Sequence, residues 1–292
     1  MNRSVGVIGL GIMGSAISAN LVRSGFATFG YDVLPARRKA LHRAGGIALR
    51  SSAEVAAHSQ IVLTSLPSAA ALHAVARELA RGGRRGAIVL ETSTLPIKDK
   101  TRAHGLLEAA GVALLDCPLS GTGAQAKTGD LSVYASGTRK GYEAAIPVFE
   151  GFARSHYFLG AFGNGSKMKF VANLMVAIHN VSAAEAFVLG MKAGLDPKTI
   201  YRVAGDGAGT SRMFQVRGPM MVAGRYGDAT MKNEVWQKDM KIIGAFAARL
   251  RAPTPLFKAS AKVYKVAMAQ GFALKDTGAV CAVLEKLAGV RR

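Results

Sequence analysis

Hydrophobic residues in the first 160 positions gather in short apolar runs, and Ala- and Leu-rich stretches with helical spacing separate these runs. Runs rich in Val, Ile, Phe and Tyr and bounded by Gly, Pro or Asp are typical of buried strands. Strands that alternate with helices predict a doubly wound α/β sheet. The expected strands are "VGVIGL" (5–10), "FATFGYD" (26–32), "IVLTSLP" (61–67), "AIVLETST" (87–94), "VALLDCP" (112–118), "LSVYASG" (131–137) and "HYFLG" (156–160).

The pattern changes at the turn-forming segment "GAFGNG" (160–165), after which only long helical runs follow. A chain of 292 residues is also near the size at which a single core stops growing, so two domains are expected. We therefore predict an α/β domain at 1–162 and an all-α domain at 163–292. The expected helices of the second domain span 167–193, 197–205, 232–250, 255–270 and 277–289.

The charge balance is strongly basic, with 38 Lys and Arg against 18 Asp and Glu, a formal charge of +20. Such a surface attracts phosphates, acidic metabolites and nucleic acid. The basic residues are scattered, however, and short clusters such as "RGGRR" (81–85) carry no interleaved aromatics or recognition-helix pattern. We interpret the charge as a solvated basic surface and expect no nucleic-acid partner.

Apolar stretches are interrupted before the ~20 residues that a membrane span needs, and "MNRSVGVIGL" enters the first strand without a cleavage-site pattern. We therefore expect a cytoplasmic protein without a membrane partner. Cys117, Cys281 and the six histidines show no metal-ligand spacing, so no metal is expected. Cys117, on an apolar strand, is interpreted as a buried structural thiol.

The first strand runs into "GLGIMG", which places Gly9, Gly11 and Gly14 in G-x-G-x-x-G spacing before a helical run. In this motif the first glycine permits a tight turn, the second lets a pyrophosphate approach, and the third lets helix and strand pack closely. The second strand ends in Asp32, where a carboxylate can accept the ribose hydroxyls. Together these features predict a dinucleotide site.

Five motifs in register make the chain resemble the β-hydroxyacid dehydrogenases, the group around 3-hydroxyisobutyrate dehydrogenase. They are "GLGIMG", "ETSTLP" (91–96), "DCPLSGTGAQAKTGDL" (116–131), "GNGSKMKFVAN" (163–173) and "QKD" (237–239). The resemblance spans nearly the whole chain. It implies a Rossmann domain at 1–162, an α-helical substrate and oligomerisation domain, and hydride transfer between NAD(P) and a short 3-hydroxy acid.

The resemblance also implies roles for individual residues. Thr94 would lie near the nicotinamide, Ser120, Gly121 and Thr122 would cradle the substrate carboxylate, and Lys238 would reach the cofactor from the helical domain. The family commonly has Gly where this chain has Thr122, which adds a methyl and a hydroxyl beside the substrate. The cofactor-binding set is Gly9, Leu10, Gly11, Ile12, Met13, Gly14, Asp32, Leu66, Pro67, Thr94 and Lys238.

Local chemistry supports an anion site at Ser120–Thr122, since hydroxyl donors flank a Gly whose backbone N–H can face an anion. The alternative for Ser120 is a hydroxyl that only caps a turn. Ser211, Arg212 and Phe214 fall where the family lines its outer pocket, although loop packing would explain them nearly as well. The substrate is expected to be 3-hydroxyisobutyrate- or threonate-like, and "GSKMK" followed by Ala172 looks closer to the threonate branch.

Lys169 and Asn173 stand four residues apart, so they share one helix face, about 40° apart. A neighbouring stripe of Met168, Val171, Met175 and Ile178 suits core packing. We predict that Lys169 is the general acid/base and that Asn173 holds the reacting oxygen; a snorkelling lysine beside a helix-terminal asparagine is the structural alternative. In oxidation the neutral amine would take the hydroxyl proton, so we expect the closed cleft and the cation of Lys238 to lower its pKa.

Asp32 would repel a 2′-phosphate, so we expect NAD, with NADP less favoured although Arg37 and Arg38 follow closely. Ala- and Met-rich helices expose more apolar surface than one layer covers, and with the resemblance this predicts a homodimer or homotetramer. Two other classes stay open: a non-catalytic dinucleotide-binding module and an imine reductase. Lys169 disfavours both, because relatives of these kinds usually lack the lysine.

Overall fold

The computed structural model describes residues 4–291 of the chain. It divides into two compact parts, Met1–Lys169, here called the α/β unit, and Phe170–Arg292, the helical unit. The border between them falls inside helix α8 (Asn164–Lys192), which begins just after the domain border predicted at 162/163.

The α/β unit is built on a six-stranded sheet in which neighbouring strands are all parallel, in the order β3-β2-β1-β4-β5-β6. This is the strand order of the dinucleotide-binding fold, and it confirms the predicted α/β Rossmann class. The strands are β1 (Ser4–Ile8), β2 (Ala27–Tyr31), β3 (Ile47–Ala48), β4 (Ile61–Thr64), β5 (Ile88–Glu91) and β6 (Ala113–Asp116).

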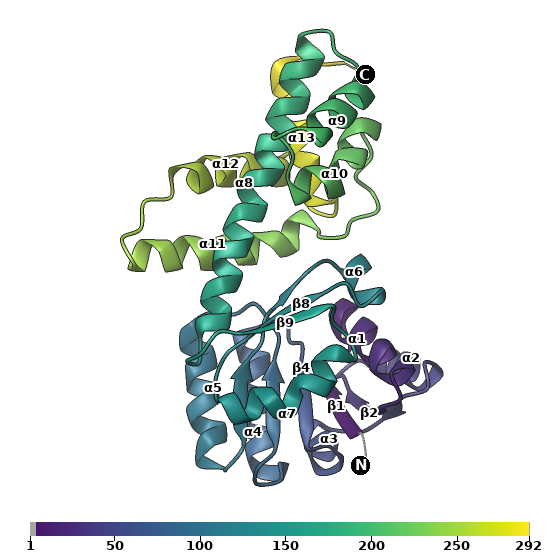
Figure 1. The fold of residues 1–292 in the computed structure, drawn as a ribbon, viewed down its shortest axis with the longest axis vertical. Coiled ribbons are helices and arrows are strands. Elements are labelled where there is room, and N and C mark those ends of the chain that lie inside the picture. The colour runs from purple at the N-terminus through teal and green to yellow at the C-terminus, as the bar shows by residue number, and fades with distance from the viewer. Residues whose placement is uncertain (1–3, 292) are drawn as a thin grey trace. The chain divides into compact units, whose positions relative to one another are not determined.

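Successive strand residues enter cores on opposite faces of this sheet, as the two-residue period of a strand requires. Val62 and Leu114 belong to one cluster, whereas Leu63 and Leu115 belong to the other. Both faces are therefore covered by helices, which explains the continuous apolar runs in the sequence. One face carries α3 (Ser52–His58), α4 (Ala69–Gly82) and α5 (Ile97–Ala109); the other carries α1 (Ile12–Arg23), α2 (Pro35–Arg43) and α7 (Arg139–Glu150) (Figure 1).

The last two predicted strands are present but form a separate three-stranded sheet with β7. An isolated bridge between Asp116 and Ser136 links this second sheet to the end of β6. β3 and β7 have two residues each, too short to produce a hydrophobic run, and were not predicted. The second sheet comprises β7 (Leu119–Ser120), β8 (Ser132–Ala135) and β9 (Ser155–Phe158), with α6 (Gly123–Lys127) between β7 and β8.

The described part of the helical unit contains helices and no strands, as predicted. One helix, α10, was not predicted, because Gly218 and Pro219 in its sequence read as helix breakers. Packing explains the glycine, because the Tyr201 ring fills the space where a side chain at Gly218 would stand. The helices after α8 are α9 (Pro197–Asp206), α10 (Arg212–Ala223), α11 (Asn233–Arg249), α12 (Pro255–Ala269), the 3₁₀ turn η1 (Thr277–Ala279) and α13 (Val280–Ala288) (Figure 1).

A buried ion pair joins α10 to the segment before η1. Arg217 Nε donates to Asp276 Oδ1 at 2.8 Å, and the other carboxylate oxygen accepts from the backbone N–H groups of Thr230 and Met231. Burial alone would raise the pKa of Asp276, but Arg217 and these donors lower it below its ordinary value. The pair thus fixes a loop that no apolar pattern specifies.

Helix α8 buries a different face from the one predicted. Met168, Val171 and Met175 are 41%, 53% and 49% exposed, so the expectation that this stripe packs in the core is wrong. The buried face combines small and aromatic residues with polar ones whose hydrogen bonds offset their desolvation. Its buried members are Ser166, Lys169, Phe170, Asn173, Ala177, Asn180, Val181, Ala184 and Phe187.

By length and composition alone α8 is also apolar enough to cross a membrane, with 29 residues and a mean hydropathy of 1.5 in one 18-residue window. The core helix of a soluble protein passes the same test. Asn180 lies in the middle of this helix and donates from Nδ2 to the hydroxyl of Tyr264 on α12 at 3.0 Å. Such a bond places α8 within a protein core along this part of its length.

Candidate active site

The three glycines after β1 are required for three separate reasons. Gly9 has a φ of +89°, a left-handed conformation that favours glycine, and a Cβ there would stand 2.2 Å from the carbonyl oxygen of Ser65. A Cβ on Gly14 would stand 1.9 Å from the carbonyl oxygen of Gly9, so the first turn of α1 packs directly on the loop. A Cβ on Gly11 would meet nothing closer than 3.9 Å, which leaves an open approach to the backbone.

The open side of this loop is an anion-binding surface. Gly11 is the N-cap of α1 and offers no side-chain cap, and Ile12 and Met13 begin the helix, Ile12 with an exposed side chain. Uncapped N–H groups and the positive end of a helix dipole suit a phosphate. The pyrophosphate of a dinucleotide therefore fits here. Leu10 contributes differently, since its side chain lies in the core and its N–H donates to Asp32.

Asp32 stands at the end of β2, where the sequence placed it, but most of its acceptor capacity is occupied. Its Oδ2 accepts from the N–H of Leu10 at 2.8 Å and from Arg37 at 3.1 Å, and its Oδ1 accepts from the N–H of Leu34 at 2.9 Å. An ionised carboxylate has about four acceptor positions, so one remains on Oδ1. Arg37 is about half exposed and can leave Oδ2 without disturbing the core.

The other cofactor candidates of this unit follow neighbouring parallel strands and so meet at one edge of the sheet. Leu66 and Pro67 follow β4, and Thr94 follows β5. A side-chain hydrogen bond joins the two loops, because the N–H of Leu66 donates to Oγ of Ser93 at 2.8 Å. Leu66 is buried, Thr94 half-buried and Pro67 exposed, so these loops present both backbone and side-chain groups.

The loop of Ser120, Gly121 and Thr122 lies beside the glycine-rich loop, since a Cβ on the next residue, Gly123, would stand 2.6 Å from the side chain of Ile12. Thr122 caps α6: the hydroxyl of Thr122 accepts from the N–H of Gln125, and the Gln125 side chain accepts from the N–H of Thr122. The hydroxyl and the backbone N–H of Thr122 are therefore both hydrogen-bonded to Gln125. Ser120 and the backbone of Gly121 are the members that can face an anion, and Gly121 has a φ of +135°.

Lys169 lies on the buried face of α8 and is 9% exposed. Asn173, one turn later, donates from Nδ2 to Oδ2 of Asp239 at 3.0 Å. A carboxylate cannot donate, so this contact fixes which end of the Asn173 amide faces Asp239. Asp239 also forms an ion pair with the half-buried Lys238 at 3.6 Å.

Two residues of the predicted outer pocket have packing roles instead. Ser211 is the N-cap of α10 and accepts from the N–H of Phe214 at 3.1 Å. The Phe214 ring is buried and stacks on Phe187 and Tyr201, with ring centroids 5.4 and 5.6 Å apart. Loop packing, the alternative left open by the sequence, therefore explains both.

Cys117 is fully buried, as interpreted from the sequence, and burial beside the carboxylates of Asp116 and Glu91 raises its pKa well above the ordinary value. A thiol that keeps its proton is a poor nucleophile.

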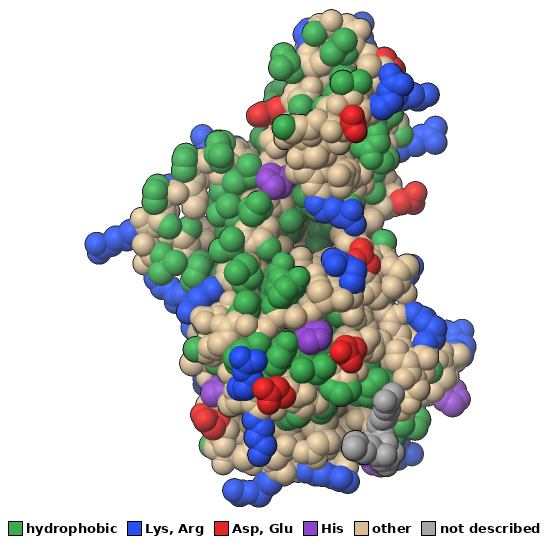
Figure 2. Space-filling view, in the orientation of Figure 1, with side chains coloured by type: hydrophobic (Ala, Val, Ile, Leu, Met, Phe, Trp, Pro, Cys, Tyr) green, Lys and Arg blue, Asp and Glu red, His purple; other side chains and the backbone are tan. Residues whose placement is uncertain are grey.

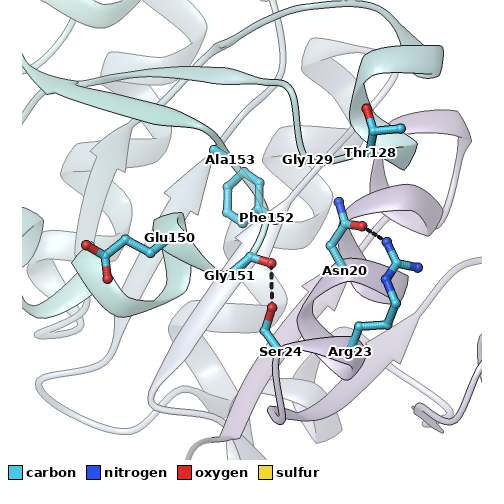
Figure 3. Close-up of a pocket in the computed structure, with 9 residues that line it drawn as sticks. All are labelled: Asn20, Arg23, Ser24, Thr128, Gly129, Glu150, Gly151, Phe152 and Ala153. Carbon is cyan, nitrogen blue, oxygen red and sulfur yellow. Dashed lines mark hydrogen bonds between the residues drawn. The ribbon is translucent and has the colours of Figure 1, made fainter.

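A polar hollow at the far end of α1 has no part in this arrangement. Arg23 and Ser24 lie about 18 Å along the helix from the glycine-rich loop, at 1.5 Å per residue. Figure 3 shows the Arg23 side chain bonded to Asn20, and the hydroxyl of Ser24 donates to the carbonyl of Gly151 at 3.0 Å. Two contacts between lining residues thus use polar groups of the hollow. It is lined by Asn20, Arg23, Ser24, Thr128, Gly129, Glu150, Gly151, Phe152 and Ala153.

Sequence reasoning missed the role of Asp239, although "QKD" was recognised as a motif. A buried Asp placed next to a Lys, on a helix face shared with core residues, was the available signal. It also missed Asp116 and Ser166, whose contact joins segments 50 residues apart. No local sequence pattern indicates a contact between residues so far apart in the chain.

Comparisons with known proteins agree with this arrangement. Residues 4–160 match the family model described as the NAD-binding domain of 6-phosphogluconate dehydrogenase, and residues 163–284 match that described as the NAD-binding domain of NADP-dependent 3-hydroxyisobutyrate dehydrogenase. An L-threonate dehydrogenase of Cupriavidus necator is 33% identical over 96% of this chain and 95% of its own length. The mitochondrial 3-hydroxyisobutyrate dehydrogenase of Mus musculus is 27% identical over 94% and 85%.

A solved structure described as 3-hydroxyisobutyrate dehydrogenase from Salmonella typhimurium superimposes with a TM-score of 0.86, at 29% identity and over 96% of this chain and 99% of its own. A Rossmann unit with an open glycine-rich loop, a buried lysine on helix α8 at the end of that unit, and a helical unit after it define a nicotinamide-dependent oxidoreductase. The chain belongs to the β-hydroxyacid dehydrogenase family and is an NAD(P)-dependent 3-hydroxyacid dehydrogenase.

The surroundings of Gly11 and Gly14 predict that alanine at Gly11 weakens cofactor binding alone, whereas alanine at Gly14 also lowers stability. Gly11→Ala places its methyl in open space, so the melting temperature should stay within about 2 °C of wild type while the Kd for NADH rises at least ~10-fold, because the methyl blocks the approach to the pyrophosphate. Gly14→Ala should lower the melting temperature as well, since its Cβ has no room. Thermal melts and NADH fluorescence titrations measure both, and equal stability of the two variants would contradict the packing argument.

Proposed function

We propose that the protein transfers a hydride between NAD and a short 3-hydroxy acid, with Lys169 as general acid/base. The observation that carries the proposal is a buried lysine placed one helical turn before an asparagine whose amide is oriented by Asp239. A nicotinamide cofactor supplies the hydride acceptor or donor. The residues of this chain must then bind the substrate, orient its hydroxyl carbon and move one proton.

Proton movement is the task of Lys169. In oxidation its neutral amine takes the proton of the substrate hydroxyl, and in reduction its ammonium returns that proton to the alkoxide oxygen. Asn173 Nδ2 carries two hydrogens; one is directed at Asp239, so the other can hold the reacting oxygen. Because Asp239 fixes the amide, the oxygen is held in one orientation during the reaction.

Substrate recognition is assigned to the loop beside the glycine-rich turn. Ser120 and the N–H of Gly121 would bind the substrate carboxylate, while Thr122 holds the loop closed through its cap on α6. The relatives named L-threonate dehydrogenase and 3-hydroxyisobutyrate dehydrogenase support a substrate of these two kinds, a sugar acid or a branched 3-hydroxy acid. Assaying a panel of short 3-hydroxy acids by NADH appearance identifies it, and no turnover with any of them would refute the proposal.

Lys169→Ala should lower kcat by ~10² to 10⁴, the effect of removing a general acid/base, while the Kd for NAD changes little. The matched control is Lys167→Ala, two residues away, where the lysine is exposed and its ammonium donates to Oδ1 of Asn164 at 2.9 Å. Oxidation by the native enzyme should accelerate as pH rises and the amine loses its proton, and the Lys169 variant should lose this dependence. Equal damage from the two substitutions would assign Lys169 a structural role.

The cofactor is proposed to be NAD in preference to NADP. The carboxylate of Asp32 has one acceptor position left for a ribose hydroxyl and repels a 2′-phosphate. Arg37 and Arg38 lie against the same residue, and Arg38 donates to the Asp32 carbonyl at 2.6 Å, so a 2′-phosphate would find cations close by. The preference is therefore expected to depend on one carboxylate.

Asp32→Ser should reverse or sharply weaken the preference. Removing the negative charge while keeping Arg37 and Arg38 should shift the ratio of kcat/KM for NAD over NADP by at least ~10-fold toward NADP, about 1.4 kcal/mol. Steady-state kinetics with both cofactors provides the ratio. A native enzyme that clearly prefers NADP would contradict the assignment.

Self-association is proposed to use the exposed apolar face of α8. Met168, Val171 and Met175 lie on one side of this helix, and Figure 2 shows hydrophobic side chains gathered over the α8, α11 and α12 region. A contiguous apolar patch of this kind is typical of a subunit interface. A second copy of the chain covering the stripe would form a closed, symmetric contact.

Light scattering should therefore give at least twice the 30.5 kDa chain mass at micromolar concentration. Val171→Glu should shift the protein toward monomer, because a charge on the stripe would be desolvated in the interface. Leu106→Glu, at an exposed apolar position of α5, serves as the control and should leave the mass unchanged. A native monomer would rule out the association.

A further inference from the structure

Lys100 on α5 is a charged residue without a role in the chemistry described above. Its side chain is 0% exposed, and its Nζ lies 2.6 Å from Oε2 of Glu91 and 2.7 Å from Oδ1 of Asp116. Fully buried lysines are rare and are retained only with partners. Burial acts to lower the pKa of Lys100, but the two carboxylates outweigh it and raise the pKa above the ordinary value. The ammonium is thus permanently charged in the core.

Each carboxylate holds a different segment of the site. Glu91, the last residue of β5, accepts on Oε1 from the N–H of Ser93 at 3.0 Å. Ser93 in turn accepts the N–H of Leu66 and immediately precedes Thr94. The Glu91 branch therefore fixes the two loops assigned to the cofactor.

The Asp116 branch fixes the start of helix α8. Asp116 accepts from the N–H of Ser166 at 2.7 Å and from its hydroxyl at 2.8 Å, and Ser136 Oγ accepts from the N–H of Gly165 at 2.9 Å. A carboxylate at the N-terminus satisfies orphan N–H groups and complements the helix dipole. Lys169 follows Ser166 by three residues, about 4.5 Å along the axis.

We propose that Lys100 is a positioning residue of this dehydrogenase: it ties the loops assigned to the nicotinamide side to the helix turn that carries Lys169. The proposal rests on the proposed function for its effect on turnover. The ammonium bridges the side chains of Glu91 and Asp116, whose strands also pair in the main sheet, and the two carboxylates are otherwise directed to separate segments. Loss of this bridge leaves each segment bonded to its own carboxylate and the strands β5 and β6 still paired, but it removes the ionic connection between the two side chains.

The first test is Lys100→Met, which keeps an unbranched side chain one heavy atom shorter and removes the charge. Because a misplacement of about 1 Å costs up to ~10² in rate, kcat should fall ~10- to 100-fold while KM for NAD stays within about threefold. The melting temperature should fall too, since two buried carboxylates lose their counter-ion. Lys100→Arg, which keeps the charge, should recover part of kcat.

A charge-matched double variant separates positioning from stability. Glu91→Gln with Lys100→Met removes one charge of each sign, and the amide oxygen of the new side chain can still accept from Ser93. The melting temperature should return most of the way to the native value while kcat stays low, because no ammonium then joins the side chains of the two branches. Recovery of kcat together with stability would overturn the proposal, as would a native kcat in Lys100→Met.

Ser166→Ala tests the Asp116 branch without changing any charge. If Lys100→Met fails to fold, this variant tests the positioning role in its place. We expect kcat to fall roughly 3- to 10-fold, and hydrogen exchange at the amides of 165 and 166 to quicken. Ser132→Ala is the matched control, because its hydroxyl bonds that of Ser155 at 2.8 Å in the second sheet of the same unit. That control should change neither kcat nor the exchange at 165 and 166.

The exchange measurement needs no substrate, so it distinguishes failure of the proposed function from failure of the positioning role of Lys100. If the native protein oxidises none of the 3-hydroxy acids, the proposed function fails, and faster exchange at 165 and 166 in the Lys100 variants still supports the bridge to α8. If the native protein is active but Lys100→Met and Ser166→Ala leave both kcat and exchange unchanged, the positioning role is refuted.

Discussion

The carboxylate of Asp116 is the contact on which the α/β unit depends most. Asp116 is the last residue of β6, an edge strand of the main sheet, and its backbone pairs with Ser136 at the start of the link to the second sheet. Its side chain binds Lys100 and the first turn of α8. A single buried acceptor therefore connects two sheets, a covering helix and the helix that carries the proposed proton donor. Without it, the end of β6 and the beginning of α8 would each expose unsatisfied polar groups to the core.

Parallel strands and the glycine-rich loop were predictable because each is encoded in neighbouring residues. The apolar runs are continuous where both faces are buried, and the backbone atoms packed against Gly9 and Gly14 leave no room for a side chain at either position. Helix α10 was not predictable in this way, since its stability comes from Phe214 and Gly218 packing against Tyr201 on another helix. Tertiary contacts there outweigh local preference.

In helix α8 the sequence spacing predicts that Lys169 and Asn173 share one face, but it does not predict which face of the helix is buried. Lys169 and Asn173 share a face because of helical geometry alone. The spacing predicts the neighbouring apolar stripe as the core face, yet the polar side is buried, because Asp116, Asp239 and Tyr264 supply partners from elsewhere in the chain. Partners so distant in sequence leave no periodic signal.

The permanent charge of Lys100 has a consequence for kinetics. A group with a raised pKa in the folded state keeps its proton at every pH up to its ordinary titration range, so the stability it contributes stays constant there and declines only in stronger alkali. The positive charge of Lys100 therefore stays constant across neutral and mildly alkaline solution. Any rise in oxidation rate over that range therefore reports on the ionisation of a group other than Lys100.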